Sequence, residues 1–198
     1  MLRLPHGAFM SSRGGGGLVK GARRLALTGT PGTGKTTVAK LLADAGLAVE
    51  SVEKLAERHG CIGDVDPLDG ARPVDLVELS ASLEEEWQTP SDTITVVDGH
   101  LSHNLPVNAV VVLRCSPNVL ESRLNARGYT EAKISENCDW ELLGGAWNES
   151  RGDVPWIEFD TSLDSAERVV AALGNWIADG FKTTGHKSVI DWVAVQEG

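Results

Sequence analysis

The order of hydrophobic and polar residues along the chain predicts an alternation of strands and helices. Apolar, often β-branched runs occupy residues 24–28, 47–50, 93–97, 107–113 and 154–159. The β-branched runs in particular are typical of strands buried on both faces of a parallel sheet. Between the runs, apolar residues recur every three or four positions, which indicates amphipathic helices. We predict helices over residues 34–45, 51–59, 117–128, 130–148 and 164–178, and over 74–88 a helix or a strand that turns into one.

Local signals set some of the boundaries. Ser51 and Ser116 stand where helix N-caps are expected, and Pro117 suits the first position of a helix. Residues 60–73 contain glycines and prolines without periodicity. They predict a loop of a length that is usually kept for function.

The alternation predicts an α/β fold of three layers with a mostly parallel sheet, formed by residues 23–180. Residues 1–22 are basic and glycine-rich and are expected to be disordered. Residues 181–198 form a C-terminal tail. The tail contains an apolar cluster that could dock on the rest of the domain, although the sequence alone does not decide whether it docks. The cluster consists of Val189, Ile190, Trp192 and Val193.

A phosphate-binding motif follows the first predicted strand. The sequence from Gly29 to Thr37 matches the pattern G-x-x-x-x-G-K-[ST]. Its glycines let backbone N–H groups point at phosphate oxygens, and the next helix adds its positive N-terminal dipole. Lys35 is expected to reach the β- and γ-phosphates and the Thr36 hydroxyl to bind Mg²⁺. The alternative is a glycine-rich turn without a ligand, which the strand before the motif and the helix after it disfavour.

A second group of candidate residues ends the predicted strand at residues 93–97. Asp98 would lie in the crevice at the carboxyl ends of the strands and could hold Mg²⁺ as a Walker B residue. His100 could orient a water molecule or a phosphate. The simpler alternatives are an aspartate that caps a turn and a histidine on the surface. His100 and His103 also form H-x-x-H, but a third zinc ligand is not evident.

Three arginines follow and could neutralise the charge of a transferred phosphoryl group, namely Arg114, Arg123 and Arg127. Arg123 and Arg127 are four residues apart, on one helical face, and could belong to a closing lid. Alternatively, they form a solvated basic face that pairs with Glu121 or Glu131.

Net charge and cysteine content narrow the classes of function that the chain could have. The chain of 198 residues has a net charge of −10. Five of the 18 basic residues and none of the 28 acidic residues precede Leu25, so the rest carries 13 basic and 28 acidic residues, a net charge of −15. Such a surface repels nucleic acid, and direct DNA binding is not expected. The three cysteines are far apart and are expected to be reduced, in a cytoplasmic setting. No apolar run approaches the roughly 20 residues that span a membrane.

In these residues the chain resembles the sixth adenylate kinase isoenzyme family. The resemblance rests on the segment 27–37 with its Thr-Gly-Thr-Pro-Gly start, on Asp98-x-His100, and on residues 113–141 with Arg123 and Arg127. It covers about residues 24–177. Archaeal members of that family are known as adenylate kinases, and eukaryotic members are nucleotide kinases and ATPases of small-ribosomal-subunit maturation.

The resemblance implies a P-loop NTPase fold of the nucleoside monophosphate kinase type. It implies transfer of the terminal phosphate of ATP to AMP or another nucleoside monophosphate, with Mg²⁺ and with additional ATPase activity. Residues 52–73 would bind the monophosphate, and residues 126–136 would form a short lid. The residues that resemble the ATP site of the family are Gly32, Gly34, Lys35, Thr36, Thr37 and Arg127.

Three function classes stay open at this stage. The first is a metabolic nucleotide kinase, in which Lys35, Asp98, His100 and Arg127 serve catalysis. The second is an assembly ATPase that acts on a basic small-subunit ribosomal protein, in an archaeal-type cytoplasm or a eukaryotic nucleus. The third is a kinase of another small acceptor. A GTPase is disfavoured because the chain has no Asn-Lys-x-Asp motif.

Overall fold

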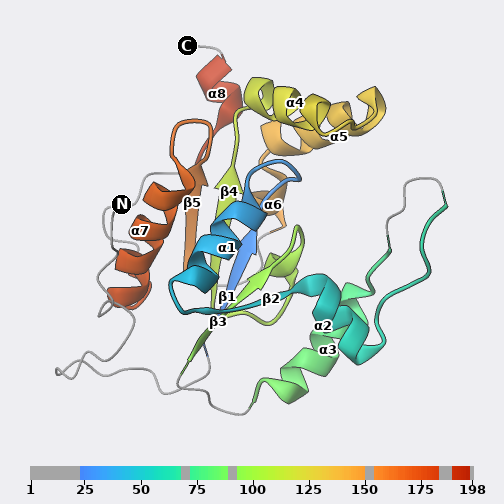
Figure 1. Cartoon of the computed structure of the whole chain (residues 1–198), viewed down its shortest axis with the longest axis vertical. Helices are drawn as coiled ribbons and strands as arrows, with labels where there is room; N and C mark the ends of the chain where they lie inside the picture. Colours follow the sequence, from blue (N-terminus) through green and yellow to red (C-terminus); the bar gives the residue numbers. More distant parts are fainter. Residues whose placement is uncertain (1–22, 68–71, 89–92, 150–153, 183–188, 197–198) are drawn as a thin grey trace.

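Five parallel strands form one sheet at the centre of the fold (Figure 1). The structure is a computed structural model that describes residues 23–67, 72–88, 93–149, 154–182 and 189–196. Along the sheet the strands lie in the order β2-β3-β1-β4-β5, and every neighbouring pair is parallel. The predicted strands are confirmed within two residues at each end; they are β1 (Arg23–Thr28), β2 (Ala48–Ser51), β3 (Ile94–Asp98), β4 (Ala109–Arg114) and β5 (Trp156–Asp160).

Helices cover both faces of the sheet and give the predicted three layers. Along β1, Leu25 and Leu27 point to one face, where they join a core formed with α1 (Lys35–Asp44) and α7 (Ala166–Ala178). Ala26 points to the other face and joins a core formed with α2 (Val52–His59) and α3 (Leu76–Glu86). Successive strand residues point to opposite faces, so a strand buried on both sides needs a continuous apolar run.

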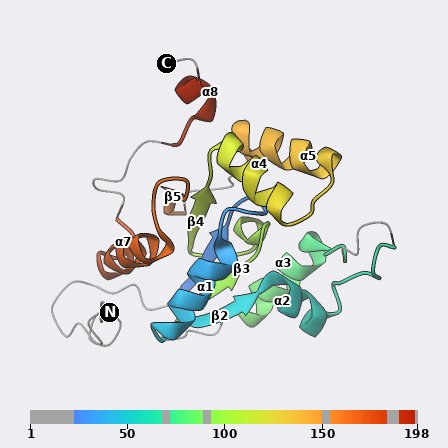
Figure 2. The same ribbon diagram turned by 45° about the horizontal axis from the view of Figure 1, so that its top comes forward.

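A further pair of helices lies at the carboxyl end of the sheet, α4 (Pro117–Ala126) and α5 (Glu131–Leu142) (Figures 1 and 2). They enclose a small apolar core with Leu120, Leu124 and Ile134. The prediction of one helix over residues 130–148 is wrong in one respect. Gly144, with a φ of 65°, lies in the left-handed region and separates α5 from the short α6 (Gly145–Asn148).

The two predicted serine caps differ. The Ser51 side chain accepts a hydrogen bond from the Lys54 amide at 3.2 Å, so this cap is confirmed. Ser116 occupies the cap position of α4, but its side chain makes no capping bond. The following Pro117 has no N–H to satisfy, and the Ser116 amide donates instead to Ser162 Oγ at 2.6 Å.

The remaining segments are short. A 3₁₀ turn, η1 (Ser102–Asn104), follows β3, and the tail contains α8 (Trp192–Gln196). Trp192 is only 5% exposed, so the tail docks on the body. Within the predicted loop at residues 60–73, Ile62 forms an isolated antiparallel bridge with Val74. Residues 1–22 and 68–71 lie outside the described part of the chain. Among the described helices, none combines the length and the apolar character that crossing a membrane would require.

Candidate active site

The phosphate-binding loop connects β1 to α1 and lies at the carboxyl end of the sheet. Two of its glycines are required by the packing. Gly29 has a φ of 137°, and a Cβ there would lie 2.3 Å from the Leu113 carbonyl oxygen. Gly32 has a φ of 95°, and a Cβ there would lie 2.8 Å from Leu120 Cδ1. The loop therefore wraps closely around the end of β4 and the side of α4, with a backbone that only glycine adopts easily.

Lys35 begins α1, directly after Gly34, and its side chain folds back over the loop. Its Nζ donates hydrogen bonds to the carbonyl oxygens of Gly29 at 2.7 Å and Thr30 at 3.1 Å. Burial lowers the pKa of Lys35 to about 8, an effect that Arg127 strengthens and that Asp98 and Glu141 oppose. Thr36 and Thr37 follow in the first turn of α1 and are exposed.

Asp98 ends β3 beside the loop. In the sheet register it stands opposite Leu27 of β1, two residues before Gly29. Burial raises the pKa of Asp98, although the positive charge of Lys35 works in the opposite direction. Asp98 Oδ1 is buried and finds no hydrogen-bond partner in the described part of the chain. The structure thus brings Asp98 within electrostatic reach of Lys35.

His100 lies against the same loop. Its Nδ1 donates to the Gly29 carbonyl oxygen at 3.0 Å, and its ring meets the edge of Trp140 with centroids 6.0 Å apart. Burial lowers the pKa of His100, which favours the neutral ring. With the proton on Nδ1, the lone pair is on Nε2.

The His103 side chain has a structural role, because its ring contacts residues of the fold outside the phosphate-binding loop. Its Nδ1 donates to Thr28 Oγ1 at 2.9 Å, and the Thr28 hydroxyl donates to the His100 carbonyl oxygen at 2.5 Å. On the other side of the ring, Nε2 lies 3.2 Å from Glu149 Oε2. The two histidines of the H-x-x-H pattern therefore make separate contacts.

The three candidate arginines do not form one group. Arg127 is the exposed C-cap of α4, and its charge reaches Lys35. Arg123 donates to the Gly32 carbonyl oxygen at 3.4 Å and to the Thr161 carbonyl oxygen at 2.7 Å. It is therefore not a solvated partner of Glu121 or Glu131, because its planar group ties the loop to the segment after β5.

Arg114 was expected to neutralise the charge of a transferred phosphoryl group, but its side chain is buried, since the residue is only 2% exposed. Its Nε donates to Glu141 Oε1 at 2.7 Å, and its Nη1 donates to Glu158 Oε1 at 3.1 Å. Burial alone would lower the pKa of Arg114, but the two glutamates outweigh it and raise the pKa. Arg114 thus neutralises buried carboxylates, and its side chain is not available to a transferred phosphate.

The sequence reasoning also missed two residues that hold the loop. The Thr30 hydroxyl donates to Glu141 Oε2 at 2.5 Å. Both residues are at most 2% exposed. Glu141 belongs to the segment that carries the family resemblance, but a single acidic residue in a helix has no spacing that would indicate its partner.

The region predicted to bind the monophosphate lies around α2. Its arginines form ion pairs at the surface, Arg58 with Glu50 and Glu86, and Arg72 with Glu57. A groove of ≈ 400 Å³ is lined by residues 60–63, 73–75 and Glu78, and Arg72 Nε donates to the carbonyl oxygen of one of them, Gly63, at 3.2 Å. The predicted acceptor region therefore has both cationic groups and open space.

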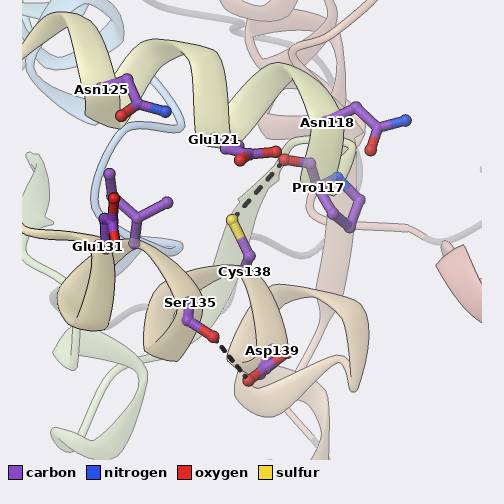
Figure 3. A pocket seen from close by; sticks show the side chains of 9 residues that line it. Pro117, Asn118, Glu121, Asn125, Glu131, Ser135, Cys138 and Asp139 are labelled. Carbon is purple, nitrogen blue, oxygen red and sulfur yellow. Dashed lines mark hydrogen bonds between the residues drawn. The ribbon is translucent and has the colours of Figure 1, made fainter.

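A second groove, of ≈ 570 Å³, lies between α4 and α5 (Figure 3). Three carboxylates line it, from Glu121, Glu131 and Asp139. Cys138 Sγ donates to the Pro117 carbonyl oxygen at 3.7 Å across the groove. Lys35 and Asp98 do not line this groove, which is acidic in character.

Sequence comparison finds relatives over most of the chain. A family model described as an AAA domain matches residues 25–144. A protein of Archaeoglobus fulgidus is 41% identical over 150 residues, 75% of this chain and 79% of its own length. A protein of Pyrococcus abyssi is 38% identical over 175 residues, 87% of this chain and 93% of its own length. Both carry the name "Putative adenylate kinase".

Solved structures of small-molecule kinases share the fold. Shikimate kinase from Acinetobacter baumannii gives a TM-score of 0.55 at 15% identity, over 80% of this chain and 94% of its own. A gluconokinase from Sinorhizobium meliloti gives a TM-score of 0.52 at 20% identity, over 84% of this chain and 99% of its own. At these identities the likeness concerns the fold alone, and it agrees with the predicted P-loop kinase architecture.

Proposed function

The chain belongs to the adenylate kinase-like P-loop family of its archaeal relatives, and on this premise we propose that it transfers the terminal phosphate of ATP to AMP or another nucleoside monophosphate. One observation carries the proposal. Lys35, held by two loop carbonyls, and the carboxylate of Asp98 stand together beside the phosphate-binding loop at the carboxyl end of a parallel sheet. Ligands bind at this edge in open α/β sheets.

The chain's own residues can position and neutralise the phosphates. Lys35 Nζ donates hydrogen bonds to the carbonyl oxygens of Gly29 and Thr30, and a bound phosphate would accept hydrogen bonds from Nζ in their place. Arg127 adds a second positive charge near Lys35 from the end of α4. Gly32, Gly34 and Thr36 supply backbone N–H groups in the loop and at the N-terminus of α1, and Thr37, whose N–H donates to the Gly34 carbonyl oxygen, offers its exposed hydroxyl. Attack by a monophosphate oxygen, which is already ionised, needs positioning and charge neutralisation rather than a general base.

The residues present fit a magnesium ion. Asp98 Oδ1 is buried without a hydrogen-bond partner in the described residues, and a hard cation would satisfy such an oxygen. Thr36 offers its hydroxyl from the first turn of α1, so Asp98 and Thr36 would hold the ion. A bound Mg²⁺ would supply positive charge that neutralises the phosphates.

A water molecule, unlike a monophosphate, must lose a proton, and His100 can accept it. In the neutral ring, the Nδ1 proton is engaged with Gly29, and Nε2 is the basic end. We expect His100→Ala to lower ATP hydrolysis about 100-fold or more, the loss typical of general-base catalysis, and AMP phosphorylation less than threefold. Both rates come from the same preparation, with and without AMP. Equal losses in the two reactions would contradict this division of roles.

The acceptor is identified by a product assay. The protein is incubated with Mg²⁺, ATP and each nucleoside monophosphate in turn, and the diphosphates formed are separated by chromatography. Turnover with at least one monophosphate is expected, and Lys35→Ala is the control for a contaminating kinase. No turnover with any of them would overturn the kinase proposal.

A second candidate function is that of an assembly ATPase with a basic small-subunit ribosomal protein as its partner, in an archaeal-type cytoplasm. It is favoured by the net charge of −15 after residue 24 and by the acidic groove between α4 and α5 (Figure 3). A pull-down with purified small-subunit proteins tests it. Binding that weakens as salt rises is expected, and failure to bind at low salt would contradict it.

A further inference from the structure

A buried carboxylate joins the phosphate-binding loop to the C-terminal tail. Glu141, on α5, is 2% exposed. Its Oε2 accepts from the Thr30 hydroxyl at 2.5 Å, and its Oε1 accepts from Trp192 Nε1 at 3.0 Å. The same Oε1 also accepts from Arg114 Nε at 2.7 Å and from the Cys115 amide at 3.1 Å. One side chain thus connects the loop after β1, the end of β4 and α8.

The tail is attached to the same charged cluster at several points. The Ile190 amide donates to Glu158 Oε2 at 2.6 Å, and the Ile190 carbonyl oxygen accepts from Arg114 Nη1 at 3.1 Å. The Arg114 guanidinium lies over the Trp192 ring, 5.9 Å from its centroid. The tail therefore contacts all three buried charged residues of the cluster, Arg114, Glu141 and Glu158.

The loop end of this connection leads directly to Lys35. The Thr30 hydroxyl is bound by Glu141, and the Thr30 carbonyl oxygen accepts from Lys35 Nζ at 3.1 Å and from Thr33 Oγ1 at 2.8 Å. A change in the position of Glu141 would move Thr30 and with it the carbonyl that orients Lys35. In a buried hydrogen-bond network, the loss of one donor is felt by the others.

We propose that Trp192 and Glu141 are positioning residues of the phosphate-binding loop. The docked tail fixes Glu141, and Glu141 fixes Thr30 in the arrangement that receives the phosphates. Nucleotide binding and tail docking then strengthen each other, because a coupling free energy between two sites acts equally in both directions. This inference rests on the proposed nucleotide binding at the loop and adds a second region of the chain to it.

The substitution Trp192→Phe tests the coupling, because it keeps an aromatic ring at this position and removes the N–H donor, together with the second ring of the indole. The probe is ADP with Mg²⁺, and calorimetry on the full chain measures its Kd. We expect the variant to bind ADP about 3-fold to 10-fold more weakly, less than the full loss of a hydrogen bond to a charged group, because Arg114 and the Cys115 amide still hold Glu141. Trp87→Phe is the matched control, since Trp87 also lies against an arginine, with Arg24 5.0 Å from its ring centroid. That variant is expected to bind ADP as the natural chain does.

Two further measurements separate positioning from a purely structural role. In the natural chain, ADP should slow amide hydrogen exchange in residues 189–196 several-fold, although this segment lies outside the phosphate site. In a double-mutant cycle, Trp192→Phe and Thr30→Val should lose less ADP affinity together than the sum of their separate losses, because both act through Glu141.

The outcomes are distinct. Three results would overturn the coupling: equal ADP affinity of Trp192→Phe and the natural chain, unchanged exchange rates, or additive losses in the double-mutant cycle. Each of them would leave the proposed kinase function standing. Absence of ADP binding by the natural chain overturns the nucleotide site itself and the coupling with it.

Discussion

The donor and acceptor regions of the candidate site are built in different ways. On the donor side, buried or half-buried partners hold the loop, since the buried Glu141 binds Thr30 and the half-buried Arg123 donates to the Gly32 carbonyl oxygen. On the acceptor side, the ion pairs are at the surface. The side chains of Arg72 and Glu57 are 34% and 50% exposed. Buried bonds fix one geometry, whereas exposed ion pairs contribute at most about 1 kcal/mol and exchange partners easily.

This difference suggests separate tasks for the two regions. A loop that binds the same triphosphate in every cycle benefits from being organised before the ligand arrives. Arginines in exposed pairs can release a glutamate and bind an acceptor phosphate at little cost. The predictions below test the comparison from its strongest consequence to its weakest.

The largest effect is expected from removing the charge at the centre of the donor side. Lys35→Ala should lower kcat/KM for phosphoryl transfer about 100-fold to 1000-fold, the loss typical of one well-placed electrostatic group. Steady-state kinetics with ATP and the preferred monophosphate measure it. Lys40→Ala, an exposed lysine of the same helix, is the control and should change little. Similar losses in both variants would contradict a specific role of Lys35.

The next effect is on stability. Gly32→Ala should destabilise the fold by about 1–3 kcal/mol more than Gly46→Ala, because only Gly32 would also place a Cβ against Leu120. Both glycines have a φ near 95°, so the conformational strain is shared and the difference isolates the packing. Urea unfolding of the two variants measures the difference. Equal midpoints would show that the loop is less tightly enclosed than the structure indicates.

The pKa of Lys35 predicts a dependence on pH. Burial holds this pKa at about 8, below the ordinary value of 10.5, and bound phosphates would raise it. Binding therefore takes up a proton above pH 8, and ADP affinity should fall by up to about tenfold per pH unit there.

For the same reason, the buried charge of Lys35 costs stability below pH 8, and this cost is relieved as pH rises from about 8 towards 10.5. Calorimetric titrations between pH 7 and 10 test the binding prediction. In Lys35→Arg the charge persists, so its affinity should change less over this interval. A parallel decline in both proteins would assign the effect to other groups.

The smallest effect is expected on the acceptor side. Glu57→Gln should change the free energy of unfolding by less than about 0.5 kcal/mol, because its pair with Arg72 is exposed. It should lower KM for the monophosphate about 2-fold to 5-fold, since Arg72 no longer has a competing carboxylate, and leave ATP hydrolysis unchanged. Glu53→Gln, on the same helix, is the control. A large loss of stability would contradict the contrast between the two regions.

The sequence predicted most of the fold because its signals are local. The β-branched run that became β3 and the serine before α2 act within a few residues, and both predictions are confirmed. The loop motif is also contiguous in the sequence. Asp98 ends a strand, and in a parallel sheet the carboxyl end of this strand lies at the same edge as the phosphate-binding loop. Arg114 and Arg123 were misread, because an arginine on its own does not indicate whether its partner is a phosphate, a backbone carbonyl or a buried glutamate.

The sequence by itself therefore determined the conformation of the phosphate-binding loop and indicated the class of ligand that we propose for it. Its attachment was decided by the tertiary structure. Thr30, Glu141 and Trp192 are separated by 111 and 51 residues along the chain, and they meet only because the fold brings the loop after β1, α5 and the tail together. Contacts between such distant residues leave no periodic pattern, because each depends on where the whole chain places a single side chain.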